Sequence, residues 1–142
     1  MKIYEPKDVN EARRIISKDA GALIRCFDVE LLRKLLEIKG SHSLILSLKN
    51  GKNSIRGIDS GFNHVLANLA NKNGVTICFD MNELKGLDKK NKSIILSRLM
   101  QNMRICRKKK CKIKVINYRS VYDVRSLFLS LGCSSEQARD IV

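Results

Sequence analysis

The amino-acid sequence predicts an α/β fold in which βα units repeat along a parallel sheet. Five short apolar segments alternate with segments whose apolar residues recur at helical spacing. Parallel strands need crossover helices, so this alternation favours a parallel sheet. The length of 142 residues and the 44% hydrophobic content suit one domain, residues 1–142, with its own core. The predicted strands lie near Ile3 and over residues 22–27, 43–48, 75–79 and 113–116.

The first two helices have recognisable ends. Asp8 and Glu11 have capping-box spacing at the start of the first helix. The second helix runs from Asp28, as its cap, toward Gly40. The first helix should bury one apolar stripe, formed by Val9, Ala12, Ile15 and Ile16.

A third helix is predicted between residues 59 and 72. Asp59 or Ser60 is available to cap its first turn, which places Asn63 and His64 near its start. The apolar residues at helical spacing are Phe62, Val65, Leu66 and Leu69.

Two further helices should follow the fourth strand and the fifth. A long helix begins within residues 88–92 and ends in the basic run 107–110, where cations complement the helix dipole. The helix after the last strand stops at Gly132, and Ser134 with Gln137 suits a second capping box that opens a short terminal helix. The long helix should bury Ile95, Leu99, Met103 and Cys106.

The composition points to a polyanionic partner. Lys and Arg outnumber Asp and Glu by 28 to 14, which gives a formal charge of +14. RNA, DNA and anionic membranes all satisfy this charge. No apolar stretch approaches the roughly 20 residues that cross a bilayer, and the start MKIYEPKDV lacks a signal peptide's apolar core. We therefore expect a cytoplasmic protein that does not span a membrane.

The five cysteines do not form a disulfide framework. Their number is odd and their spacing irregular, so Cys26, Cys78 and Cys133 are expected to behave as small apolar residues. Cys106 and Cys111 lack the spacing and the nearby His of a zinc site. We expect no metal site in this chain.

Basic and polar residues gather at two strand-to-helix junctions. The first combines the loop residues Lys49, Lys52 and Arg56 with Asn63 and His64, at the end of a strand where α/β folds usually place ligands. These donors could hold a phosphate or a sugar edge. From the residues alone, a solvated basic loop beside a core histidine explains the same pattern better, because an isolated His is weak support for a site.

The second junction follows the last strand. Asn117, Tyr118 and Arg119 leave that strand, while Asp123 and Arg125 enter the next helix, and their side chains could reach the same face as His64. For Asp123 a structural role beside the helix dipole is favoured. The run RICRKKKCKIK before this strand suits phosphate neutralisation, with a solubilising helix end as the alternative.

The segments FNHVLANLANKNGV and YDVRSLFLSLG together resemble protein component 3 of archaeal ribonuclease P, which is related to a subunit of the nuclear ribonuclease P and MRP enzymes. The resemblance implies a (β/α) barrel. Because eight-stranded barrels need at least about 200 residues, we expect a shortened, TIM-barrel-like fold that lacks N-terminal units. The exposed edge of its sheet should be covered by a helix or a partner.

The resemblance also implies a function. The chain would be a protein subunit of a ribonucleoprotein endonuclease that removes the 5′ leader from precursor tRNA. The RNA would carry out hydrolysis with magnesium, so this chain would be non-catalytic and bind no cofactor. Its partners would be ribonuclease P RNA, the ferredoxin-like protein subunit of the same enzyme and, indirectly, precursor tRNA. The expected RNA contacts are Lys49, Lys52, Arg56, Asn63, His64, Lys72, Arg107, Lys108, Lys109, Lys110, Arg119 and Arg125.

Two other classes compete with this interpretation. A general RNA-binding protein that relies on charge explains the +14 equally well. A barrel hydrolase needs ligands or nucleophiles that the chain barely has, since it contains only His42 and His64 and no HExxH motif. Three Tyr, four Phe and no Trp make a base-stacking platform unexpected, so shape and phosphate contacts should dominate.

Overall fold

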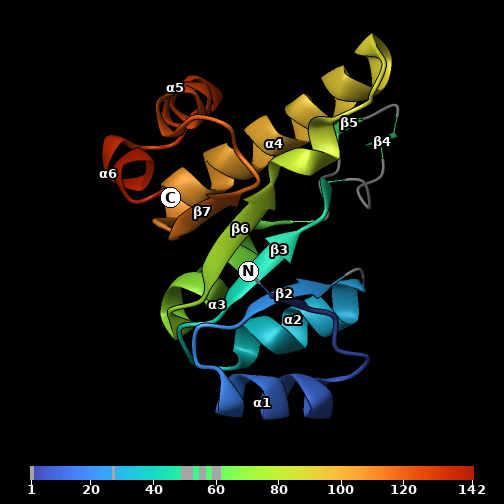
Figure 1. The fold of residues 1–142 in the computed structure, drawn as a ribbon, viewed down its shortest axis with the longest axis vertical. Helices are drawn as coiled ribbons and strands as arrows, with labels where there is room; N and C mark the ends of the chain where they lie inside the picture. Colours follow the sequence, from blue (N-terminus) through green and yellow to red (C-terminus); the bar gives the residue numbers. More distant parts are fainter. Residues whose placement is uncertain (1, 27, 49–52, 55–56, 59–61) are drawn as a thin grey trace.

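The computed structural model describes residues 2–26, 28–48, 53–54, 57–58 and 62–142 (Figure 1). Within them, five parallel strands alternate with helices in one open sheet of order β1-β2-β3-β6-β7, which follows the order of the chain. The predicted α/β class is therefore confirmed, and the open sheet is consistent with an incomplete TIM-barrel-like fold. The strands are β1 (Ile3–Tyr4), β2 (Leu23–Cys26), β3 (Ser43–Leu46), β6 (Thr76–Asp80) and β7 (Ile113–Ile116).

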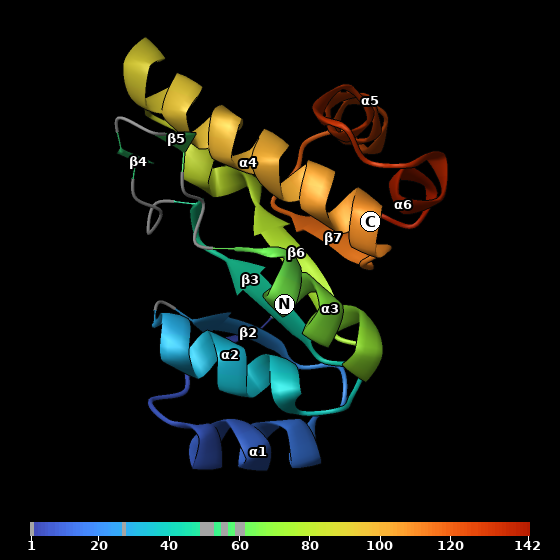
Figure 2. The same cartoon turned by 180° about the vertical axis from the view of Figure 1, so that it is seen from behind.

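Helices cover one face of this sheet. In Figures 1 and 2, α2, α3 and α4 lie on the same side of the strands, while α5 and α6 lie beside α4 and β7. The main core lies between the helices and the sheet, and the opposite face carries a smaller cluster of Leu23, Ile45, Cys78 and Ile116. The helices are α1 (Val9–Lys18), α2 (Val29–Glu37), α3 (His64–Asn73), α4 (Lys89–Lys109), α5 (Val121–Leu131) and α6 (Ser135–Arg139), with a 3-10 turn, η2 (Met81–Leu84).

Most helix ends lie where the sequence places them. Asp28 and Asp88 accept hydrogen bonds from the backbone N–H groups of the first turns of α2 and α4. Gly132 ends α5 in the left-handed region (φ 118°), and Ser134 with Gln137 forms a complete capping box on α6. Local sequence signals therefore fix these ends.

The first helix departs from its prediction in one detail. Asp8 accepts from the backbone N–H of Glu11 at 2.8 Å, as a cap should. The Glu11 carboxylate, however, accepts from the backbone N–H of Lys7 at 2.9 Å, one residue before the cap. The capping box at α1 is thus displaced by one residue from the predicted form.

The predicted cap of α3 is wrong. Asn63 is the N-cap residue, and its Oδ1 accepts from the backbone N–H of Leu66 at 3.0 Å. Phe62 therefore precedes the helix and is buried, while Val65 is 61% exposed. Asp59 and Ser60 lie outside the described residues. Burial of Phe62 fixes the chain just before the helix, so tertiary packing selects one cap among several suitable residues.

The segment expected to be a basic loop, residues 49–59, contains a small antiparallel ribbon. Its strands are β4 (Asn53–Ser54) and β5 (Gly57–Ile58), with Asn53 paired to Ile58. Sequence periodicity gives no sign of strands this short, because two residues cannot show an alternation.

The β7 edge of the sheet is covered. The backbone N–H of Val115 donates to the carbonyl of Ile141 at 2.8 Å, and Ile141 is fully buried. Phe128 of α5 packs on Phe79 of β6 with ring centroids 6.0 Å apart, which holds the C-terminal helices to the sheet. The cover at this edge is the non-helical segment after α6 and not a helix, as Ile141 lies beyond the end of α6 at Arg139.

Among the described helices, none combines the length and the apolar character that a membrane span requires.

Candidate nucleic-acid interface

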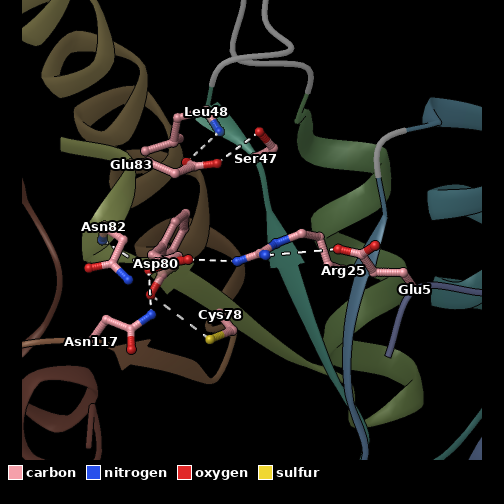
Figure 3. Close-up of polar contacts among 10 residues, drawn as sticks. Glu5, Arg25, Ser47, Leu48, Cys78, Asp80, Asn82, Glu83 and Asn117 are labelled. Carbon is pink, nitrogen blue, oxygen red and sulfur yellow. Dashed lines mark hydrogen bonds and ion pairs between the residues drawn. The ribbon is translucent and has the colours of Figure 1, made fainter. Parts of the chain in front are cut away.

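Asp80 joins three strands at the carboxyl edge of the sheet (Figure 3). Its Oδ2 lies 2.6 Å from Arg25 Nη2 of β2. Its Oδ1 accepts from Asn117 Nδ2, just past β7, at 2.8 Å, and from the backbone N–H of Asn82 in η2 at 2.9 Å. Arg25 also lies 3.9 Å from Glu5 Oε1. Because Asp80 is only 7% exposed, its oxygens depend on these partners, and not on water, for their hydrogen bonds.

Glu83 makes the second connection at this edge. Its Oε1 accepts from Ser47 Oγ at 2.8 Å and its Oε2 from the backbone N–H of Leu48 at 3.0 Å, as Figure 3 shows. Arg98 of α4 donates to the carbonyl of Leu48 at 2.6 Å. The end of β3 is therefore tied to η2 and to α4.

Both carboxylates act within the fold. A general base or a metal ligand needs lone pairs that face a ligand, and the oxygens of Asp80 and Glu83 accept from groups of the chain itself. In the part of the chain that the structure describes, no three His, Cys, Asp or Glu side chains cluster as metal ligands would. The two carboxylates therefore hold the carboxyl edge of the sheet together.

Sequence reasoning missed most of this network. Arg25 is the one charged residue in the apolar run 22–27, and Asp80 directly follows another apolar run. Polar residues at the carboxyl ends of parallel strands meet at one edge. With the strand order known, this rule would have predicted that Arg25 and Asp80 lie close together.

The three loop residues of the predicted site, Lys49, Lys52 and Arg56, lie outside the described residues. Their contribution to RNA binding stays a prediction.

His64 lies in a groove between α3 and α4. It is exposed at the first position of α3, and it lines a cavity of about 560 Å³ together with Arg104 and Lys108 of α4. Asn63 also lines this cavity, although its Oδ1 serves as the α3 cap. The core-histidine alternative is wrong for His64, because the side chain faces solvent.

His42 has the core position instead. Its side chain is fully buried, and its Nε2 lies 3.2 Å from the carbonyl of Leu35. Burial lowers the pKa of His42, which the Leu35 carbonyl partly offsets. The neutral imidazole is thus part of the core.

The basic end of α4 is mostly exposed. Arg107 and Lys108 face solvent in its last turn, Lys109 is half-buried, and Lys110 ends the helix in the left-handed region (φ 56°). Lys72 is exposed in the last turn of α3. The exposed side chains among them are accessible to a polyanion, and their contact with RNA stays a prediction.

The second junction forms a separate cavity. Tyr118 and Arg119 line a space of about 460 Å³ between η2 and the start of α5. The groove at His64 lies between α3 and α4, and the two cavities share no lining residue. The expectation that both junctions present one face is therefore wrong, because α4 lies between α3 and α5 (Figure 1).

Arg125 is attached to the terminal helix. Its Nε donates to the carbonyl of Ala138 at 3.1 Å and its Nη2 to that of Arg139 at 3.0 Å. Arg125 is among the RNA contacts that the resemblance implies, and in the structure its guanidinium is held by the carbonyls that end α6. Cations favour that position because it carries the negative end of the helix dipole.

All five cysteines are free and buried, which agrees with the expectation that Cys26, Cys78 and Cys133 behave as small apolar residues. Burial raises the pKa of Cys78 to about 12. The hydrogen bond with Cys111, together with burial, raises the pKa of Cys106. Neither thiol is a nucleophile at neutral pH.

The fold and these surfaces define the class of the molecule: an open, parallel α/β protein with helices on one face and basic grooves beside α4. No protein-family model and no curated protein matches the chain. Among solved structures, the chain is similar to a chain in the cryo-EM structure of archaeal ribonuclease P with mature tRNA. The TM-score is 0.77 over 98% of this chain, at 19% sequence identity. This chain spans 62% of the length of that chain.

Proposed function

We propose that this chain is a protein subunit of ribonuclease P, the ribonucleoprotein that removes the 5′ leader from precursor tRNA. The observation that carries the proposal is the similarity of nearly the whole chain to a chain of archaeal ribonuclease P, with a TM-score of 0.77 over 98% of its residues. Two sequence segments also resemble a ribonuclease P protein: residues 62–75 contain the whole of α3, and residues 122–132 contain all of α5 except its first residue.

The charge of the chain supports an RNA partner. The formal net charge is +14, and exposed cations are concentrated along α4 and at its C-terminal end. Neutralising about eight phosphates would give a log–log salt slope of about −7, so binding should be strongly salt-dependent. The proposed RNA contacts are those expected from the sequence, including Lys49, Lys52 and Arg56.

The proposed role is non-catalytic. Cleavage would be carried out by the RNA with magnesium, and the protein would bind no cofactor of its own. Binding to the active fold of the RNA selects that fold and lowers the repulsion between its phosphates. The engagement of Asp80 and Glu83 in internal hydrogen bonds fits a scaffold better than a nuclease centre.

The proposed setting follows from this role. The chain would work in the cytoplasm with the ferredoxin-like protein subunit of the same enzyme. Precursor tRNA would be contacted indirectly, through the RNA.

Reconstitution tests the proposal. Precursor-tRNA cleavage would be measured with the cognate RNA and the other protein subunits, with and without this chain, over a range of magnesium concentrations. The chain should raise the rate and lower the magnesium requirement. An unchanged rate and magnesium requirement would contradict the assignment.

Residue variants refine the test. Arg56→Ala and Arg125→Ala should weaken activation of the RNA, while Arg13→Ala, on the distant helix α1, serves as an exposed control. Circular dichroism separates the two explanations, because an unfolded variant would show that its arginine acts structurally. The hydrogen bonds of Arg125 to α6 make this check necessary for that position.

The +14 charge also favours a second candidate, an RNA-binding protein without a defined complex. Such a protein would bind an unrelated structured RNA as tightly as ribonuclease P RNA and leave cleavage unchanged. A competition experiment with tRNA-sized RNA duplexes distinguishes the two.

A further inference from the structure

A cavity at the carboxyl edge of the sheet combines an apolar floor with a cationic rim. It lies between η2, the start of α4 and the β7–α5 junction, and its volume is about 460 Å³. Met81, Leu84 and Leu127 supply apolar surface. Cavities of a few hundred Å³ at this edge of an α/β sheet are where small ligands bind.

Asp80 ties the two walls of this cavity together. One wall begins at η2, whose first turn is capped by Asp80 Oδ1 through the backbone N–H of Asn82. The other begins at Asn117, whose Nδ2 donates to the same oxygen at 2.8 Å. Figure 3 shows both contacts converging on the one carboxylate. The walls are therefore held in place before any ligand arrives, which reduces the entropy lost on binding.

The rim carries more positive than negative charge. Lys85, Lys92 and Arg119 line the cavity together with one carboxylate, Asp123. The backbone N–H of Asp123 is held by Ser120 Oγ at the start of α5. Three cations against one anion favour an anionic group at the mouth of the cavity.

Tyr118 adds an aromatic surface. Tyr118 lines the cavity and is 38% exposed, so the residue is accessible to a partner. An aromatic ring beside an apolar floor suits a flat, weakly polar ring system such as a nucleobase. An extended stacking platform is not needed to hold a single base.

We propose that this cavity binds one unpaired nucleotide of an RNA strand. The base lies against Tyr118 and the apolar floor, and the adjacent phosphate lies near Lys85, Lys92 and Arg119. The identity of the strand as ribonuclease P RNA rests on the proposed function, whereas the nucleotide chemistry rests on the cavity. A peptide would match the apolar floor but would leave the cationic rim without a partner.

The experiment uses the full chain and a short single-stranded RNA with 2-aminopurine at its centre. Stacking on Tyr118 quenches the fluorescence of that base, and titration gives the affinity. Because a stacked base contributes about 1–3 kcal/mol, Tyr118→Leu should weaken binding at least about fivefold. Tyr118→Phe keeps the ring and should bind within about twofold of the unaltered protein. Tyr122→Leu is the matched control, since Tyr122 is 81% exposed on the same helix junction and does not line the cavity.

Four outcomes overturn the inference. Unchanged affinity and quenching in Tyr118→Leu would show that the cavity is not used, and an equal loss in Tyr122→Leu would show that the effect is not specific to it. Binding of free AMP as tightly as the oligonucleotide would identify a free nucleotide as the occupant. A loss of affinity in Tyr118→Leu for the ferredoxin-like subunit, with RNA binding intact, would identify a protein surface.

A parallel titration with ribonuclease P RNA separates this inference from the proposed function. If Tyr118→Leu binds that RNA specifically and as tightly as the unaltered protein does, the proposed function is supported and the nucleotide site is contradicted. Quenching of the oligonucleotide without specific binding of ribonuclease P RNA would support the nucleotide site and contradict the proposed function.

Discussion

Replacing Asp80 with asparagine should destabilise the fold without changing the shape of the side chain. The substitution removes the charge that lies 2.6 Å from Arg25 and replaces one acceptor oxygen by an amide donor. Asn117 and the backbone N–H of Asn82 can still donate to the oxygen that remains. Removal of one partner from a buried ion pair costs about 3–5 kcal/mol. Because the Arg25 side chain is 22% exposed and lies 3.9 Å from Glu5, we expect the lower limit, about 3 kcal/mol.

Urea denaturation measures this loss. With a slope of about 2 kcal/mol per molar urea, the midpoint of Asp80→Asn should fall by about 1.5 M. Asp140→Asn is the control, because Asp140 pairs with Arg139 on the surface at 3.2 Å. Its midpoint should not change measurably.

A double-mutant cycle tests the cause of the loss. Arg25→Met combined with Asp80→Asn leaves no buried charge unpaired, since the remaining Glu5 is largely exposed, so the double variant should be more stable than the sum of the single losses predicts. Equal midpoints for Asp80→Asn and Asp140→Asn would refute the reasoning, since the buried pair would then contribute no more than an exposed one.

Three further predictions concern other residues. Burial lowers the pKa of His42 below its ordinary 6.5, so the unfolded chain binds protons more readily, and stability should decrease as pH falls below about 6.5. The slope is at most about 1.4 kcal/mol per pH unit, and urea titrations between neutral and mildly acidic pH should show it in the unaltered protein and not in His42→Asn. Arg125→Met removes two hydrogen bonds to the end of α6 and should cost about 1–3 kcal/mol in thermal unfolding; a loss no larger than that of the exposed control Arg119→Met would contradict it. Lys108→Gln should weaken RNA binding for all sequences and reduce the salt slope by about 1, whereas an unchanged slope would show that Lys108 contacts no phosphate.

Local signals allowed much of the fold to be predicted. Asp28 and Asp88 cap α2 and α4 as expected, because a cap depends on a few consecutive residues. The α3 start could not be predicted the same way, since Asp59, Ser60 and Asn63 satisfy the local rule equally well. Burial of Phe62, which is a tertiary contact, favours Asn63 as the N-cap residue.

The candidate site was harder to predict because its contacts span the chain. Arg25 and Asp80 are 55 residues apart in sequence, and only the strand order brings them together. Arg125 was expected to contact RNA, and its hydrogen bonds to carbonyls 13 and 14 residues further on could not be inferred from the neighbouring sequence. Exposed cations such as Lys108 needed no tertiary information, because a charged residue at a helix end is normally on the surface.

The strand order of the sheet has a consequence for how the chain is made. Because β1, β2, β3, β6 and β7 pair in the order in which they occur, each strand finds its neighbour in the unit synthesised just before it. Contacts between units adjacent in sequence form quickly, since little chain must be ordered to close each loop. The protein can therefore assemble during translation one βα unit at a time, with the newest strand forming the growing edge of the sheet and β1 the fixed one.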